Sequence, residues 1–134
     1  MFSYLEKRKI WLVYVPLVVY WLMLIIGTSL PIQKLPMVGL GDKVNHLLAY
    51  FGLALLLNLT LIYQRKFKPL FDKSTIVTIL ICLAYGVLDE LHQIFIPGRS
   101  AETLDWLADS MGTFLGVFTL NYLINRLKYK PEFK

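Results

Sequence analysis

The chain has 134 residues, which suits one domain, and we expect residues 1–134 to form a single transmembrane domain. It is 57% hydrophobic and 17% charged, whereas soluble domains average about 45–50% apolar and about 25% charged residues, so the composition excludes an ordinary soluble protein. The net charge of +5 does not indicate nucleic-acid binding, because the basic residues lie at the ends of apolar runs. The single cysteine, Cys82, excludes an intrachain disulfide, and we expect it to be a small buried side chain.

The first predicted membrane span covers residues 10–33, which carry no charge over 24 residues. A helix rises about 1.5 Å per residue, so this run is long enough to cross a bilayer core of about 30 Å. A signal peptide would also begin with a basic head, such as the one at 7–9. However, signal peptides have a shorter apolar run of about 7–15 residues, and no small-residue cleavage site follows this one. We therefore expect a retained helix, followed by a loop at 31–41 that is rich in proline and glycine.

The second predicted helix runs over 43–63 and is apolar apart from a few polar residues near its ends. Asp42 precedes it and is a plausible N-cap, because its carboxylate can accept a hydrogen bond from a free backbone N–H group. Asp42, His46 and Tyr50 are spaced by four residues, so they share one face of this helix. A histidine at a helix end is most often a hydrogen-bonded packing residue, but the face-mates Asp42 and Tyr50 strengthen the case for a charged partner of His46.

The third predicted helix runs over 74–95 and ends at a Pro-Gly turn. Tyr85, Asp89 and Gln93 again have four-residue spacing and share a face. The fourth predicted helix runs over 104–127. It contains small residues at four-residue spacing, which allow another helix to approach closely, and we expect them to pack within the bundle: Ala108, Gly112 and Gly116.

The basic residues divide unequally between the two ends of this four-helix bundle. The end with both termini and the loop between the second and third helices has 11 of them, and the other end has 3, namely Lys34, Lys43 and Arg99. The positive-inside rule therefore predicts that both termini are cytoplasmic. Both histidines, His46 and His92, belong to the outer end. So do six of the nine acidic residues: Asp42, Asp89, Glu90, Glu102, Asp105 and Asp109.

This polar layer converges from three separate segments, and ionisable groups in or beside lipid are costly, so it is the main candidate for a functional site. Some members also have structural interpretations. Asp42 can serve only as a helix cap, and Asp105 can be an early-turn carboxylate favoured by the helix dipole. Asp109 lies one turn deeper, where a cap is no longer needed. Arg99 can pair with one of the carboxylates as a clamp. Glu90 can simply meet water, as can His92, because both lie off the face of Asp89.

A divalent metal site is a further hypothesis. Carboxylates and imidazoles are suitable ligands for Zn²⁺ or Mn²⁺, but no established ligand spacing such as H-E-x-x-H is present. Ion transport across the bilayer is not expected, because the helix interiors below the outer layer are apolar. The candidate ligands are His46, Asp89, Glu90, His92, Asp105 and Asp109.

Three motifs together resemble the VanZ-like family of small bacterial membrane proteins: D-K-V-N-H-x3-Y at 42–50, D-E-x-H-Q-x-F-x-P-G-R at 89–99 and D-x2-A-D-x2-G-x3-G at 105–116. Many family members have Asn where this sequence has Asp109, so the cluster in this sequence has one carboxylate more than the cluster in those members. The resemblance implies a function in the cell envelope. The founding member of the family is associated with resistance to the glycopeptide antibiotic teicoplanin. The signature residues that it implies are Asp42, Lys43, His46, Tyr50, Asp89, Glu90, His92, Gln93, Arg99, Asp105 and Asp109.

Two functions from different classes fit this sequence. The first is a non-catalytic plasma-membrane protein that binds an amphiphile, either a lipid-linked envelope precursor or a glycopeptide antibiotic, at its outer polar layer. Arg99 and Lys43 would hold an anionic group, while Trp106 and Phe95 would meet the acyl part. The ligand-binding residues of this hypothesis also include Asp42, Tyr50, His92 and Gln93.

The second is an intramembrane hydrolase or transferase that acts on a lipid headgroup. A carboxylate or His46 would be the base, and Arg99 would stabilise developing negative charge. Asp89 and Asp109 are the expected central pair. Carboxylates crowded into one layer repel one another unless they are paired, protonated or bridged by a cation. The candidate catalytic residues are Asp89, Asp109, His46, Glu90 and Asp105.

Overall fold

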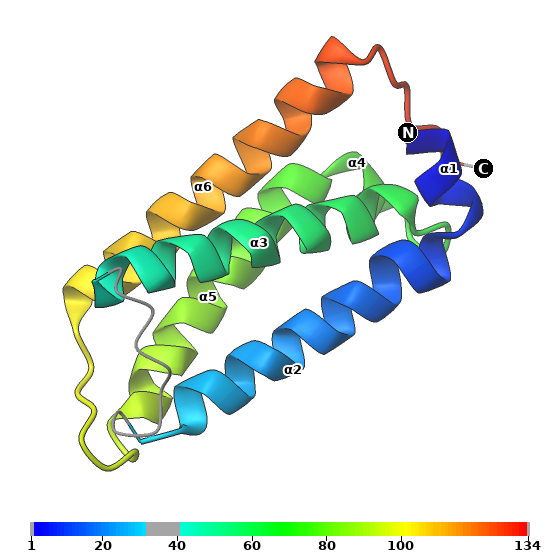
Figure 1. Ribbon diagram of the computed structural model, residues 1–134. Helices are drawn as coiled ribbons and strands as arrows, with labels where there is room; N and C mark the ends of the chain where they lie inside the picture. Colours follow the sequence, from blue (N-terminus) through cyan, green and yellow to red (C-terminus); the bar gives the residue numbers. More distant parts are fainter. Residues whose placement is uncertain (1, 32–40, 134) are drawn as a thin grey trace.

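The computed structural model describes residues 2–31 and 41–133, and these form a bundle of helices (Figure 1). Within these ranges, four segments are long and apolar enough to cross a membrane: Ile10–Ser29, Asp42–Tyr63, Ser74–Gln93 and Thr103–Arg126, with 20, 22, 20 and 24 residues. The predicted all-α architecture with four membrane spans is confirmed. The chain is a multi-pass membrane protein.

The first span is preceded by a short helix, α1 (Phe2–Lys7), and begins with a π-helical turn, η1 (Ile10–Tyr14), before α2 (Val15–Ser29). The π-helical turn has a local cause in Pro16. Proline has no N–H to donate and its ring clashes with the carbonyl group four residues earlier, so a widened turn accommodates it.

The first span ends earlier than the predicted residue 33. Leu30 has an extended backbone (φ −84°, ψ 139°), so the helix ends at Ser29. The physical reason is Pro31, since the residue before a proline is biased away from the helical conformation. Residues 32–33 of the predicted helix, the predicted loop up to residue 40, and the Lys34 of the charge count lie outside the described residues.

The remaining helices agree with the predicted spans to within two residues, although the short α4 was not predicted: α3 (Asp42–Tyr63), α4 (Lys68–Asp72), α5 (Ser74–Gln93) and α6 (Thr103–Arg126). The expected capping role of Asp42 is wrong. Gly41 is the N-cap, and Asp42 is the first helical residue, without a side-chain capping hydrogen bond. Its carboxylate still lies in the first turn, where the helix dipole favours negative charge.

The closest packing in the bundle is between α3 and α6. A Cβ atom at Gly112 would clash with the backbone oxygen of Leu47, and one at Gly116 would lie 2.6 Å from the backbone oxygen of Phe51. Ala108, the third small residue of the series, is buried. The small residues of α6 therefore pack within the bundle, as predicted, and let the two backbones meet.

The apolar core surrounds α3. One buried cluster includes Leu53, Ala54 and Leu57 of α3 together with Cys82 and Val117, so Cys82 is the buried side chain that the sequence predicts. By contrast, α2 buries only Leu17 among its own residues and leaves most of its apolar surface exposed. Such a surface suits contact with lipid.

Polar contacts join the chain segments at the end of the bundle where both termini lie (Figure 1). Arg65, after α3, forms an ion pair with Glu6 of α1, and the hydroxyl of Tyr129 donates to the same carboxylate at 2.8 Å. Lys9 donates to the backbone oxygen of Tyr63 at 2.9 Å. Burial raises the pKa of Tyr129, and its hydrogen bond to Glu6 acts in the same direction. The polar layer lies at the opposite end of the bundle.

Candidate functional site

A buried polar cluster lies where α3 and α6 begin and α5 ends. Four-residue spacing places its members on the inward faces of these helices, as the sequence predicts for Tyr50 and His46 and for Gln93 and Asp89. At most 7% of each residue is exposed. The cluster consists of His46, Tyr50, Asp89, Glu90, Gln93, Asp105 and Asp109.

The centre of the cluster is a contact between α3 and α6. Nδ1 of His46 lies 2.9 Å from Oδ1 of Asp109, and Nε2 lies 3.9 Å from Oδ2 of Asp105. Because a carboxylate only accepts hydrogen bonds, Nδ1 carries the proton in the contact with an ionised Asp109. The charged partner expected for His46 is therefore present, and it comes from α6.

Lys43 lies at the exposed edge of the cluster. Its ammonium donates to Glu102 and to Asp105, in each case at 2.8 Å. Only 3% of the Asp105 side chain is exposed, so Lys43 supplies positive charge to a carboxylate that water hardly reaches. Lys43 thus closes the cluster on one side and joins the start of α3 to the start of α6.

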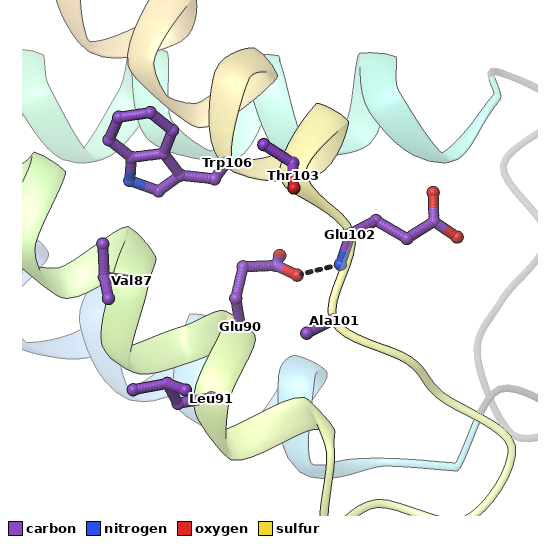
Figure 2. A pocket seen from close by; sticks show the side chains of 7 residues that line it. All are labelled: Val87, Glu90, Leu91, Ala101, Glu102, Thr103 and Trp106. Carbon is purple, nitrogen blue, oxygen red and sulfur yellow. Dashed lines mark hydrogen bonds between the residues drawn. The ribbon is translucent and has the colours of Figure 1, made fainter.

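Glu90 is buried, and the expectation that it would meet water is wrong. It lies one position beyond Asp89, which turns it by about 100° on α5, toward the start of α6. Its Oε2 accepts a hydrogen bond of 2.7 Å from the backbone N–H of Glu102 (Figure 2). Glu90 thereby fixes the residue that precedes α6.

Several buried polar atoms of the cluster have no hydrogen-bond partner among the described residues: the Tyr50 hydroxyl, Glu90 Oε1, Gln93 Nε2 and Asp109 Oδ2. Asp109 Oδ2 faces α5 at Gly86, where a Cβ atom would lie 3.4 Å from it. Glu90 follows Gly86 by one helical turn. The free oxygen of Asp109 is therefore directed at the same face of α5 that carries Glu90.

Asp89 belongs to the side of the cluster nearest α2. It lies beside the side chains of Thr28 and Gln93. Below it, the ring of Tyr85 stacks on Tyr50 at a centroid distance of 5.9 Å and meets Trp21 edge-on at 5.3 Å. These rings join the cluster to the apolar core, because Tyr50 belongs to both.

Arg99 has partners other than the expected ones. Its Nε donates to the backbone oxygen of Leu30 at 3.1 Å, Nη2 to that of Gly27 at 3.2 Å, and Nη1 to Oε1 of Gln93 at 3.3 Å. None of its partners among the described residues is a carboxylate, so the expected ion-pair clamp is wrong. Carbonyl groups at a helix end have no partner within the helix. Arg99 donates to two carbonyl groups at the end of α2, of which that of Gly27 also accepts from the Leu30 N–H, and so ties the α5–α6 link to α2.

The remaining predicted site residues lie at the periphery. Asp42 is exposed, and His92 is exposed with a contact of 3.0 Å between its Nε2 and the Ser29 hydroxyl. Phe95 is 81% exposed and extends from the link after α5. The structure thus brings together most, but not all, of the polar groups that the sequence assigns to the outer layer.

An open pocket of about 230 Å³ lies between α5 and the start of α6 (Figure 2). Trp106 forms one wall, with its Nε1 donating to the backbone oxygen of Leu83 at 3.2 Å. Glu90 connects the pocket to the buried polar cluster. Most of the lining could not be predicted from the sequence, because only the relative placement of α5 and α6 brings it together: Val87, Glu90, Leu91, Ala101, Glu102, Thr103 and Trp106.

Among the residues that the structure describes, two groups of three side chains could hold a metal ion, and they share His46. In each group one ligand atom per residue lies within 4.8 Å of the others: His46, Glu90 and Asp109 in the first, and Asp42, His46 and Asp105 in the second. The first group is fully buried, whereas Asp42 of the second is exposed. Asp89 and His92, also predicted as ligands, belong to neither group.

These features define a polytopic membrane protein whose helical bundle encloses a cluster of carboxylates and a histidine at one end. The profile of the VanZ/LLP1 family matches residues 5–125, so the chain belongs to this family, as the three sequence motifs predict. Comparisons with curated proteins and with solved structures found no match.

Proposed function

We propose that the protein binds an amphiphilic envelope ligand in the pocket between α5 and α6, on the outer side of the plasma membrane. The observation that carries this proposal is the make-up of the pocket. Val87, Leu91 and Trp106 form an apolar wall, and the buried carboxylate of Glu90 lies at the polar end. A binding site for an amphiphile requires an apolar and a polar surface side by side.

The pocket is accessible from the lipid side of α5. Val87 is 45% exposed and Leu91 51% exposed, and their neighbours Leu88 and Ile94 are also exposed. An acyl or polyprenyl chain can therefore enter laterally from the bilayer while its headgroup reaches the start of α6. Ligand pockets usually combine such apolar walls with a few well-placed polar groups.

The charges around the pocket favour a headgroup that donates hydrogen bonds. Arg99 is engaged by backbone oxygens and Gln93, and Lys43 is engaged by two carboxylates. An anionic headgroup would have to displace one of these contacts. Glu102 and Thr103 instead offer acceptors at the mouth of the pocket. Hydroxyl groups of a saccharide on a lipid-linked precursor, or an ammonium group, are the matching chemistry.

The proposed orientation depends on charge. The cytoplasmic end would be the one with both termini, where 11 of the 14 basic residues of the chain belong. The pocket and the buried polar cluster lie at the other end of the bundle. Binding there would act on the outer leaflet, where envelope precursors and extracellular antibiotics are accessible.

Photo-crosslinking in the bacterial membrane tests this proposal. A photoreactive residue at Leu91, in the pocket, is compared with one at Leu80, which is 61% exposed on the same helix. The two positions are three turns apart on nearly one face, so both contact bulk lipid. We expect a lipid-linked saccharide to be enriched in adducts at Leu91 alone. Equal adduct profiles at the two positions would contradict the proposal.

A contribution to resistance against teicoplanin-type glycopeptides is the physiological part of the proposal. Leu91→Trp would fill the pocket, whereas Leu80→Trp changes only a lipid-facing position. We expect a host expressing the wild type or Leu80→Trp to tolerate more teicoplanin than one expressing Leu91→Trp. Equal tolerance in all three strains, with equal protein levels in the membrane, would rule this contribution out.

A second candidate function is acid–base chemistry on a lipid headgroup, and the specific observation in its favour is the His46–Asp109 contact. A histidine held by a buried carboxylate is a common arrangement for a general base. Asp109→Asn retains the shape and removes the charge. Loss of lipid turnover in reconstituted vesicles, with unchanged crosslinking at Leu91, would support an enzyme. Unchanged lipid composition after incubation with the wild type would exclude it for the lipids supplied.

A further inference from the structure

We propose that His46, Glu90 and Asp109 bind one divalent transition-metal ion inside the buried polar cluster. The three side chains come from α3, α5 and α6, and one ligand atom from each lies within 4.8 Å of the other two. Ligand atoms around a zinc ion at bond lengths of about 2.0–2.2 Å are separated by roughly 3–4 Å. Small rotations of the carboxylates would therefore complete the coordination.

The second observation is the set of free oxygen atoms. Asp109 is 1% exposed and Glu90 7% exposed, yet Asp109 Oδ2 and Glu90 Oε1 have no hydrogen-bond partner among the described residues. Buried polar atoms are nearly always paired, and an unpaired carboxylate oxygen is especially costly. Each of these carboxylates already has its other oxygen in a hydrogen bond, to His46 or to the Glu102 N–H. The free oxygens are thus left for a ligand that accepts electron pairs.

The charge of the cluster also favours a bound cation. Asp89, Glu90, Asp105 and Asp109 are four buried carboxylates. Against them stands the ammonium of Lys43, and His46 must be neutral to bind an ion, so a surplus of three negative charges remains if all four are ionised. Buried charges require a partner of opposite sign. One dication would offset two of these three charges.

The donor set selects the type of ion. One imidazole nitrogen and two carboxylate oxygens suit Zn²⁺ or Mn²⁺, whereas Ca²⁺ and Mg²⁺ prefer oxygen ligands alone. The alternative group that contains Asp42 and Asp105 is less suitable. Asp42 is exposed, and Asp105 is engaged by Lys43 at 2.8 Å.

The ion site and the amphiphile pocket share Glu90 but are separate hypotheses. Oε2 of Glu90 would remain bonded to the Glu102 N–H, and Oε1 would bind the ion. An ion there would lie next to the polar end of the pocket. Metal binding is measured on detergent-purified protein without added ligand, so its failure does not depend on whether the pocket binds an amphiphile.

The test is a titration of the purified, chelator-treated protein with Co²⁺, whose visible absorption reports coordination by protein ligands. We expect one Co²⁺ per chain in the wild type, displaced by Zn²⁺. Glu90→Gln can still accept from the Glu102 N–H, and it should weaken binding by about 100-fold or more, since even outer ligand partners contribute 10–100-fold. Asp109→Asn should do the same. Asp72→Asn is the matched control, because it is the same change at an exposed carboxylate far from the cluster.

Thermal unfolding of the same samples tests the proposal without relying on the folding of a variant. An ion that binds only the folded state raises the melting temperature, so Zn²⁺ should stabilise wild type and Asp72→Asn alike. Folded wild type that shows neither Co²⁺ absorption nor stabilisation by Zn²⁺ or Mn²⁺ would overturn the proposal. Binding of wild-type strength in folded Glu90→Gln and Asp109→Asn would overturn it as well.

Discussion

Gly112→Ala should separate the two helices that carry the His46–Asp109 contact. The added Cβ would clash with the backbone oxygen of Leu47, which follows His46 directly in α3. Backbone atoms within a helix cannot move alone, so α3 and α6 must shift apart. Extra methyl groups in a well-packed interior cost about 1–3 kcal/mol, and we expect a loss of stability in this range.

Gly27→Ala is the control for this change. Among the described residues, no atom outside the neighbouring turns of its own helix lies within 4 Å of a Cβ at this position, and Gly27 is within α2. Alanine is favoured over glycine in a helix by about 1 kcal/mol, so this variant should be as stable as the wild type or more stable. Unfolding in mixed detergent micelles, followed by circular dichroism, gives both free energies. Equal stability of Gly112→Ala and Gly27→Ala would refute the close approach of α3 and α6.

Three further perturbations test other contacts. Arg99→Gln removes most of the hydrogen bonds from the α5–α6 link to the end of α2, and it should lower the free energy of unfolding by about 1–3 kcal/mol; an unchanged value in the same assay would contradict these contacts. Lys43→Met leaves a buried carboxylate without its cation and should destabilise the protein more than Lys68→Met, whose ion pair is exposed; equal melting temperatures would contradict this. A reporter fused after Lys134 should be cytoplasmic, and an extracytoplasmic signal would reverse the proposed orientation of the site.

The sequence predicts the fold well because its strongest signals are local. Long apolar runs with few charges define the four spans, and the spacing of Ala108, Gly112 and Gly116 predicts a close helix contact. The absence of charge up to residue 33 overestimates the first span, because Pro31 ends the helix earlier.

The partners within the site could be predicted less well, because they depend on how helices lie relative to one another. Helical spacing places His46 on an inward face, but only the packing of α3 on α6 selects Asp109 as its partner. The burial of Glu90 depends on the position of the link before α6. From the sequence alone, Arg99 could contact either carboxylates or backbone carbonyl groups. The position of the end of α2 determines that it contacts carbonyl groups there.

Native mass spectrometry of the protein released from its own membranes tests the binding of an amphiphile most directly. The proposed function predicts that the wild type and Leu80→Trp each retain one lipid-linked molecule per chain, and that Leu91→Trp does not. The same retained lipids in all three proteins would contradict a binding site between α5 and α6.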